Sequence, residues 1–501
     1  MPWSLFLLHR WQRRRMYAIW NQVKSNHIKL PFIGHAYMFF GGEEGRMKTF
    51  QRFGMEAVRN GGITGLWQAS RLYVTDPVDA ECVLKTCLEK DDALKCMRLV
   101  FGNGNIFAPV SIWRRRRKIL APTFRPKNLI HFVSVFSKQS NVMVANLKKS
   151  AGGGTFSIWK YMTTYSMDSV CETTLGVHVN AQKQVTLPFI EAYEEIFKME
   201  SARLCQPWLH NEEIYKMTPL YKHHIGYKRT VHNFIDQIIK SKRKSLDQSH
   251  EGARQKTGLD QYGLKTFLEL LIDSSGGIKG YTDVELREET LVLVLAGTDT
   301  SAVGAAFTAV MLSKHQDVQE KLYQELQEVF GDSDRPIVAE DLPRLKYLEA
   351  VIKESLRLYP PVPIILRSID RDVQLPSGIT LVKDCGVIVN IWALHRNPNF
   401  WGDDAEIFRP ERFIDTPLKH PAAFMAFSYG SRGCIGYQYA MMSMKTATAA
   451  LLRQYRVLPA SMDDAMVKNK NKPIRVKVDI MMKAMDNFEV QLQPRLATTR
   501  L

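Results

Sequence analysis

Apolar residues recur at three- and four-residue spacing through most of the chain, which is the pattern of amphipathic helices. Six long segments follow it: residues 136–149, 187–199, 227–244, 283–314, 316–330 and 345–358. Runs of β-prone residues are short and few, at residues 72–74, 387–391, 474–480 and 488–492. The pattern therefore predicts a mainly α protein with a smaller β part, an α+β fold.

Local signals set the limits of several elements. Thr282 and Glu285 have the spacing of a capping box, which predicts a helix start just after Thr282. Pro360 and the proline after it predict the end of the preceding helix. The polar stretch 247–263 predicts a surface loop. Residues 397–421, rich in proline, aspartate and aromatic residues, predict a long ordered loop of the kind that usually has a function.

Size and composition favour a single large domain. No repeat and no long Pro/Gly/Ser-rich linker divides the 501 residues, and hydrophobic residues make up 45% of them, enough for a large core. The seven cysteines are an odd number, thinly spread and without a CxxC pair. They predict free thiols in a reducing compartment instead of a disulfide framework.

The net charge of +17 narrows the choice of partners. Basic clusters at residues 13–15, 114–118 and 240–244 carry part of it. They are either scattered solvated faces or contacts for an anionic membrane surface, an acidic protein or nucleic acid. No zinc-ligand spacing or recognisable nucleic-acid module accompanies the charge, so we expect no nucleic-acid partner.

The N-terminal segment is basic but only briefly apolar. Residues 3–8 are apolar, and His9 and Arg10 follow at once. A spanning helix needs ~20 apolar residues, and the core of a signal peptide ~7–15. We expect residues 1–30 to be a basic membrane-associating segment before a domain over residues 31–501. A shortened anchor, an interfacial helix and a mitochondrial presequence remain the alternatives.

The strongest chemical signal surrounds Cys434, in the string Phe-Ser-Tyr-Gly-Ser-Arg-Gly-Cys-Ile-Gly over residues 427–436. A cysteine thiolate is a strong ligand to iron if it is kept ionised. Glycines on both sides let backbone N–H groups approach the sulfur and tune its redox potential. Arg432 suits a charge-assisted pair with a carboxylate. The alternative is a glycine-rich turn with an incidental buried cysteine.

This string resembles the signature FxxGxRxCxG of the cytochrome P450 family at all its fixed positions, namely Phe427, Gly430, Arg432, Cys434 and Gly436. Other family elements follow in order, and together they cover roughly residues 30 to 495. They are WxxxR at Trp113 and Arg117, the oxygen-activation element at residues 296–301, ExxR at Glu354 and Arg357, and the Pro-Glu-Arg-Phe element that contains Arg412. The chain is identified as a member of this family.

The resemblance implies a P450 fold with haem b held between the long central helix and the cysteine loop, and with Cys434 as the axial ligand to iron. It implies that Trp113, Arg117, Arg367 and Arg432 meet the haem propionates. By spacing alone, Glu354 and Arg357 would be a solvated pair on one helix face. The resemblance implies instead a buried scaffold that they form with Arg412.

The central helix carries polar residues where helix propensity favours others. Gly297 there costs ~1 kcal/mol relative to alanine, and the Thr300 hydroxyl can bond a carbonyl one turn back. The plain alternative is a tolerated polar patch. The resemblance implies an oxygen groove beside Gly297, with Asp299 and Thr300 as the catalytic proton donors.

Residues 113–124 and 434–445 look like the family-4 clan, which includes mammalian fatty-acid ω-hydroxylases and many insect enzymes, and we favour an insect member. Many fatty-acid hydroxylases of the clan carry a glutamate that esterifies the haem. This sequence has Ala296 there, so that covalent link is impossible and fatty-acid ω-hydroxylation is disfavoured.

The resemblance implies a monooxygenase that takes electrons from NADPH through NADPH-cytochrome P450 reductase, with cytochrome b5 as a further candidate donor. Arginine and lysine residues around Arg117 would rim the face that meets this acidic flavoprotein. We expect a lipophilic small-molecule substrate, contacted by residues 97–110, 189–227 and 362–365, the helix near Ala296, and Met481 with Met482. The expected location is the cytosolic face of the endoplasmic reticulum membrane, with the mitochondrial inner membrane as the alternative.

Two other functions are compatible with the haem signature. One is an isomerase, dehydratase or peroxygenase that needs no electrons, and the other is a non-catalytic haem- or hydrophobe-binding protein. Asp299 and Thr300 favour the monooxygenase, because neither alternative needs an acid and an alcohol side by side.

Overall fold

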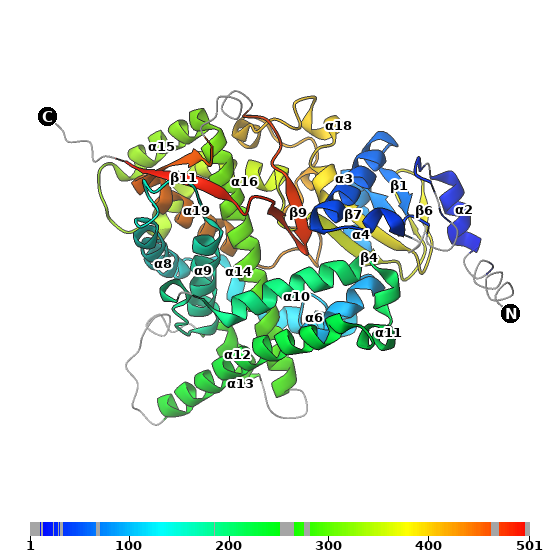
Figure 1. The fold of residues 1–501 in the computed structure, drawn as a ribbon, viewed down its shortest axis with the longest axis horizontal. Helices are drawn as coiled ribbons and strands as arrows, with labels where there is room; N and C mark the ends of the chain where they lie inside the picture. Colours follow the sequence, from blue (N-terminus) through cyan, green and yellow to red (C-terminus); the bar gives the residue numbers. More distant parts are fainter. Residues whose placement is uncertain are drawn as a thin grey trace.

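The computed structural model describes the chain except for residues 1–10, 12–13, 24, 29, 31–33, 67–70, 185, 251–264, 275–280, 462–469 and 496–501. Most of the helices gather in one large body, and a small sheet lies to one side of it beside α2 (Arg14–Gln22) and α3 (Glu43–Arg59) (Figure 1). The predicted α+β class is thereby confirmed.

All six predicted helices are present, with bounds close to the expected ones except for α12, which is longer at both ends. They are α8 (Phe132–Leu147), α10 (Pro188–Leu204), α12 (Pro219–His250), α14 (Asp283–Lys314), α15 (Gln316–Phe330) and α16 (Lys346–Leu358). The pattern missed α3 and α19 (Tyr437–Gln454). The other helices are shorter: α4 (Pro77–Thr86), α5 (Arg98–Phe101), α6 (Val110–Leu120), α7 (Pro126–Leu129), α9 (Trp159–Val170), α11 (Glu212–Lys216), α13 (Phe267–Asp273), α17 (Ile391–Leu394) and α18 (Pro398–Trp401).

Helix α14 crosses the middle of the helical body (Figure 1) and packs against α9, α12, α16 and α19. The expected capping box starts it: the Thr282 side chain accepts from the Glu285 N–H at 3.2 Å, and the Glu285 carboxylate accepts from the Thr282 N–H at 2.9 Å. Among the described residues this is also the one helix long and apolar enough to span a membrane, but 78% of its most apolar window is buried inside the protein. Such burial is typical of a core helix.

The main sheet joins segments from both halves of the chain. Its strand order is β1 (Ile63–Leu66), β2 (Arg71–Val74), β7 (Gly386–Asn390), β4 (Ile364–Ser368), and only the β2–β7 pair is parallel. Strand β7 is buried on both faces, which explains its continuous apolar run. A second sheet orders β3 (Phe156–Ser157), β11 (Glu489–Pro494) and β8 (Tyr455–Pro459), and two hairpins pair β5 (Val373–Gln374) with β6 (Thr380–Leu381) and β9 (Val476–Asp479) with β10 (Met481–Ala484).

The structure corrects the prediction of a loop over residues 247–263. Helix α12 continues to His250, and residues 251–263 lie outside the described part of the chain. The predicted long loop at 397–421 is present, interrupted only by short helical turns such as α18 and η9 (Pro410–Phe413). All seven cysteines are free thiols, as expected. The apolar residues 3–8 lie outside the described residues.

Candidate active site

The loop that carries Cys434 is a tight turn directly before α19. The Cys434 N–H donates to the Phe427 carbonyl at 2.8 Å. Gly430 has a φ of +71°, and a Cβ there would lie 2.6 Å from the Leu84 carbonyl oxygen, so this position requires glycine. The loop therefore holds Cys434 at the N-terminal end of a long helix, where negative charge is stabilised.

The surroundings of the Cys434 thiol both oppose and favour a thiolate. Burial raises the pKa of the thiol, whereas the Gly436 N–H and the Arg117 guanidinium lower it. A Cβ on Gly436 would lie 4.0 Å from the sulfur, which is an ordinary contact distance, so the backbone at this position lies close to the sulfur. Although protein groups enclose the sulfur, Cys434 is accessible.

Basic side chains gather next to this loop, and they outnumber the carboxylates that could neutralise them. Arg432 lies with its guanidinium 4.6 Å from the Trp113 ring centre and donates to the Ala108 carbonyl at 2.6 Å. Arg367 is buried and donates to the Leu366 carbonyl at 3.0 Å, and Arg117 donates to the Gly433 carbonyl at 2.9 Å. Nε of Arg367 and Nε of Arg432 are buried and have no hydrogen-bond partner among the residues that the structure describes.

Burial and mutual repulsion weaken the protonation of these groups. Burial, followed by Arg432, lowers the pKa of Arg367 to about 10, and burial lowers the pKa of Arg432 to about 10. Burial, Arg367 and Arg432 also lower the pKa of Lys90, a residue that no sequence motif indicates. Within the described part of the chain, Lys90, Arg367 and Arg432 form no ion pair. Such an excess of enclosed positive charge fits the two carboxylates of a haem.

One stripe in the middle of α14 is partly accessible although the residues beside it on the helix are buried. Leu293, Ala296, Gly297 and Thr300 are partly accessible, and their spacing places them on one helix face. The Thr300 hydroxyl donates to the Ala296 carbonyl at 2.6 Å, the back-bonding that the sequence suggested. Gly297 has a second role, because a Cβ there would lie 2.7 Å from Cγ2 of Val170 on α9. The glycine therefore lets α9 approach α14 closely.

Asp299 is fully buried and faces a different set of residues. Its Oδ1 lies 3.4 Å from Nζ of Lys483 on β10, and the same Nζ lies 3.2 Å from Oδ2 of Asp479 on β9. Burial raises the pKa of Asp299 to about 7, while Lys483 lowers it and Asp479 raises it. Neither hairpin residue could be predicted from the sequence, because nothing local links them to a helix about 180 positions earlier.

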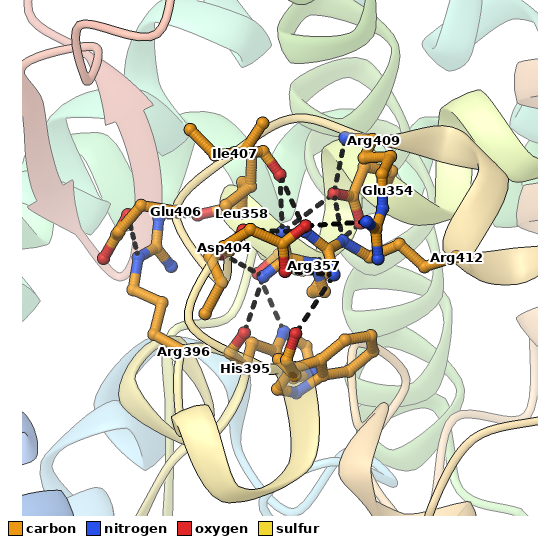
Figure 2. A network of polar contacts seen from close by, with 12 residues as sticks. Glu354, Arg357, Leu358, His395, Arg396, Asp404, Glu406, Ile407, Arg409 and Arg412 are labelled. Atoms are coloured by element: carbon orange, nitrogen blue, oxygen red, sulfur yellow. Dashed lines mark hydrogen bonds and ion pairs between the residues drawn. The ribbon is translucent and has the colours of Figure 1, made fainter.

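The structure brings Glu354, Arg357 and Arg412 together in one polar network (Figure 2). Arg357 donates to both oxygens of Glu354 at 2.6 and 2.8 Å, and Arg412 donates to Glu354 Oε1 at 3.1 Å. Arg357 also donates to the carbonyls of His395 and Ala405. All three side chains are buried, so this is not a solvated surface pair. The network ties α16 to the long loop at 397–421.

One expectation about the basic cluster on α6 is wrong. Arg116 is 1% exposed and pairs with Glu285 at 2.9 Å and Glu289 at 2.8 Å on α14, so it joins two helices and does not rim an external face. Arg114, Arg115 and Lys118 are exposed. The spacing of Trp113, Arg116 and Leu120 contained this signal, because these positions share one helix face.

Comparison with known proteins identifies relatives over nearly the whole chain. The profile of the family described as Cytochrome P450 matches residues 30–483. Cytochrome P450 4d2 of Drosophila melanogaster is 31% identical over 497 residues, covering 97% of this chain and 95% of its own. Cytochrome P450 4V2 of Mus musculus is 32% identical over 470 residues, covering 91% and 87%. Cytochrome P450 4V2 of Homo sapiens is 31% identical over 438 residues, covering 85% and 82%.

Proposed function

This chain belongs to the cytochrome P450 family and is a haem-thiolate monooxygenase, and from that premise we propose that it oxidises a lipophilic small molecule with electrons from NADPH, delivered by NADPH-cytochrome P450 reductase. Bound haem supplies the chemistry that activates dioxygen. The observation that supports the assignment of this site most directly is the enclosed cluster of Lys90, Arg367 and Arg432 next to an accessible Cys434.

The protein's own residues have separate tasks in this proposal. Cys434 would bind the iron, and the Gly436 N–H and Arg117 favour its thiolate form against the effect of burial. Arg432 and Arg367 bind the propionates, with Trp113 packed against Arg432. Ala296 at the accessible stripe leaves the haem without a covalent link to this helix. Gly297 borders the oxygen groove, and Asp299 and Thr300 hold and pass the protons that the reaction consumes.

A lipophilic substrate is supported by the apolar walls around the accessible stripe. Residues of α5, α10 and α14 and the turn between β9 and β10 pack into one hydrophobic cluster. Phe101 of α5 stacks on Phe107 at 5.2 Å between ring centres and lies 6.2 Å from Phe197 of α10. These segments include three that were expected to contact substrate, namely residues 97–110, residues 189–227 and the helix near Ala296. Turnover of a panel of lipophilic compounds with purified reductase and NADPH tests the proposed substrate class directly.

Thr300→Ala is expected to uncouple turnover without stopping electron flow. A positioned acid–base group contributes typically ~10²–10⁴-fold to the step that it assists, and electron input does not need this hydroxyl. NADPH should still be consumed, while released hydrogen peroxide replaces most of the product. The assay compares NADPH oxidised, peroxide released and product formed in both proteins.

Unchanged coupling in Thr300→Ala would remove this hydroxyl from the mechanism. Product formed by the wild type without NADPH or reductase would favour the electron-independent isomerase or peroxygenase instead.

Membrane attachment is expected through an apolar surface together with basic residues. Trp208, Met217 and Leu220 are 41%, 87% and 44% exposed, and Trp208 contacts the exposed Phe40 at 5.6 Å between ring centres. Leu209, the neighbour of Trp208 in the sequence, is buried and does not contribute to this surface. Large exposed apolar side chains that gather in one place mark an interaction surface, and each nearby basic residue adds ~1 kcal/mol at an anionic membrane.

The triple variant Trp208→Ser, Met217→Ser, Leu220→Ser should bind phosphatidylcholine–phosphatidylserine vesicles more weakly than wild type in a flotation assay. Ile414→Ser, which removes a 52% exposed side chain outside this surface, is the matched control. Complete release of the wild type by high salt alone would show that the apolar surface plays no part.

A further inference from the structure

The β9–β10 hairpin carries charge on the face that includes residues 477, 479, 481 and 483. Lys477 pairs with Lys483 across the hairpin, and Asp479 pairs with Met481, so these side chains share one face. The turn consists of Ile480 alone, with a φ of +88°, which a β-branched residue rarely adopts. A strained turn persists only where its surroundings fix it. Here those surroundings include the contact of Lys483 with α14.

Lys483 lies between two buried carboxylates. Its ammonium is 3.4 Å from Asp299 and 3.2 Å from Asp479, and all three side chains are less than 8% exposed. The Lys483 ammonium also lies 4.7 Å from the centre of the Trp159 ring, and Nε1 of Trp159 donates to Glu194 at 2.9 Å. Both oxygens of Asp299 lack a hydrogen-bond partner among the described residues. The lysine is therefore the group that holds this aspartate.

The charges in this cluster do not balance. One ammonium faces two carboxylates, and burying the second negative charge without a partner is costly. A proton on one carboxylate removes that cost. Although burial opposes it, Asp299 and Asp479 raise the pKa of Lys483, so the lysine remains charged and the proton goes to a carboxylate. The charged and titratable groups around the pair are Tyr193 and Glu194 on α10, Glu43 on α3, and Lys477 on β9.

We propose that Lys483 is a positioning residue that orients Asp299 for proton delivery, and that Asp479 keeps Asp299 protonated by competing for the same ammonium. This inference rests on the proposed role of Asp299 as the acid partner of Thr300. The hairpin thereby controls whether the Asp299 carboxyl on α14 is protonated at neutral pH and can donate its proton. A lysine paired with Asp299 alone would hold it ionised, and an ionised carboxylate cannot act as an acid.

The first test is the pH dependence of coupling, measured as product formed per NADPH oxidised. In wild type, coupling should fall as the pH rises through about 7, where Asp299 loses its proton. Asp479→Asn removes the competitor and commits Lys483 to Asp299. Because an uncontested opposite charge lowers a carboxyl pKa by about one unit or more, the midpoint of the coupling profile should move to lower pH by that amount. A profile that does not move would overturn the role of Asp479.

The second test removes the ammonium. Lys483→Met should reduce coupling at every pH by roughly tenfold, a part of the ~10²–10⁴-fold effect of a positioned acid. Lys483→Arg keeps the positive charge and should retain most of the wild-type coupling. Lys477→Met is the matched control, because Lys477 lies directly opposite Lys483 but pairs with Glu43 at 3.5 Å, and it should leave coupling unchanged. Equal coupling in Lys483→Met and Lys477→Met, or no rescue by arginine, would overturn the positioning role.

The third readout does not depend on activity. The infrared carbonyl band of a protonated buried carboxyl, assigned by its loss in Asp299→Asn, should titrate near pH 7 in wild type and at lower pH in Asp479→Asn. If Asp299→Asn leaves coupling unchanged, the acid role in the proposed function fails, and the infrared band still decides whether the hairpin controls this proton. If Asp299→Asn uncouples turnover but neither hairpin variant changes coupling or the band, the hairpin inference alone fails.

Discussion

Cys434→His is expected to abolish the red-shifted Soret band of the ferrous–carbonyl complex, because only a thiolate opposite to carbon monoxide produces it. The loop geometry supports this choice of ligand. Cys434 lies just before α19, the residue is accessible, and the Gly436 N–H and Arg117 favour its ionised form. The measurement is the difference spectrum of the reduced protein with and without carbon monoxide.

Cys82→Ser is the matched control, since Cys82 is the other cysteine that is not buried. It should retain the wild-type band. A red-shifted band that survives in Cys434→His would mean that another cysteine holds the iron, and the assignment of the site would be wrong.

Glu354→Ala and Arg357→Ala are each expected to yield little haem-loaded protein. Removing one member of a buried ion pair leaves the other charge uncompensated, which costs about 3–5 kcal/mol. That is a large share of the ~5–15 kcal/mol that stabilises a typical folded protein. In Arg357→Ala the carbonyls of His395 and Ala405 also lose their donor. Haem content per mole of purified protein and thermal unfolding report the effect.

Lys353→Ala tests whether any loss of charge on α16 has the same effect. Lys353 is next to Glu354, but it is partly exposed and pairs with Glu349 at 2.7 Å. An ion pair of this kind is worth at most about 1 kcal/mol, so this variant should load haem normally. Stable, haem-replete protein from both scaffold variants would show that their network contributes little.

The parts of the site that the sequence revealed are those encoded in contiguous or helically spaced residues. The Cys434 loop is one string of ten residues, and Thr300 reaches a carbonyl only one turn away. The helix bounds followed from local signals such as the capping box of α14. The network of Glu354 with Arg412 came from family resemblance, because spacing alone indicated a surface pair.

What the sequence did not reveal depends on contacts between distant segments. Lys483 and Asp479 look like ordinary alternating residues of a hairpin, and only the folded chain places them on Asp299. Lys90 belongs to no recognisable sequence motif, yet it lies close enough to Arg367 and Arg432 for their charges to lower its pKa. Arg116 was misplaced for a different reason, because a run of four arginines hides the helical phase that turns one of them inward.

The parallel pairing of β2 with β7 has a consequence for how the chain is made. Leu72 pairs with Val387, roughly 300 residues later. At ~5–20 residues per second, a ribosome needs on the order of 15–60 seconds to add that length. Throughout that interval one edge of the β1–β2 pair lacks its partner, and an unpaired strand edge invites association with other chains. In newly made protein this edge therefore stays without its native partner strand until the second half of the chain has been synthesised.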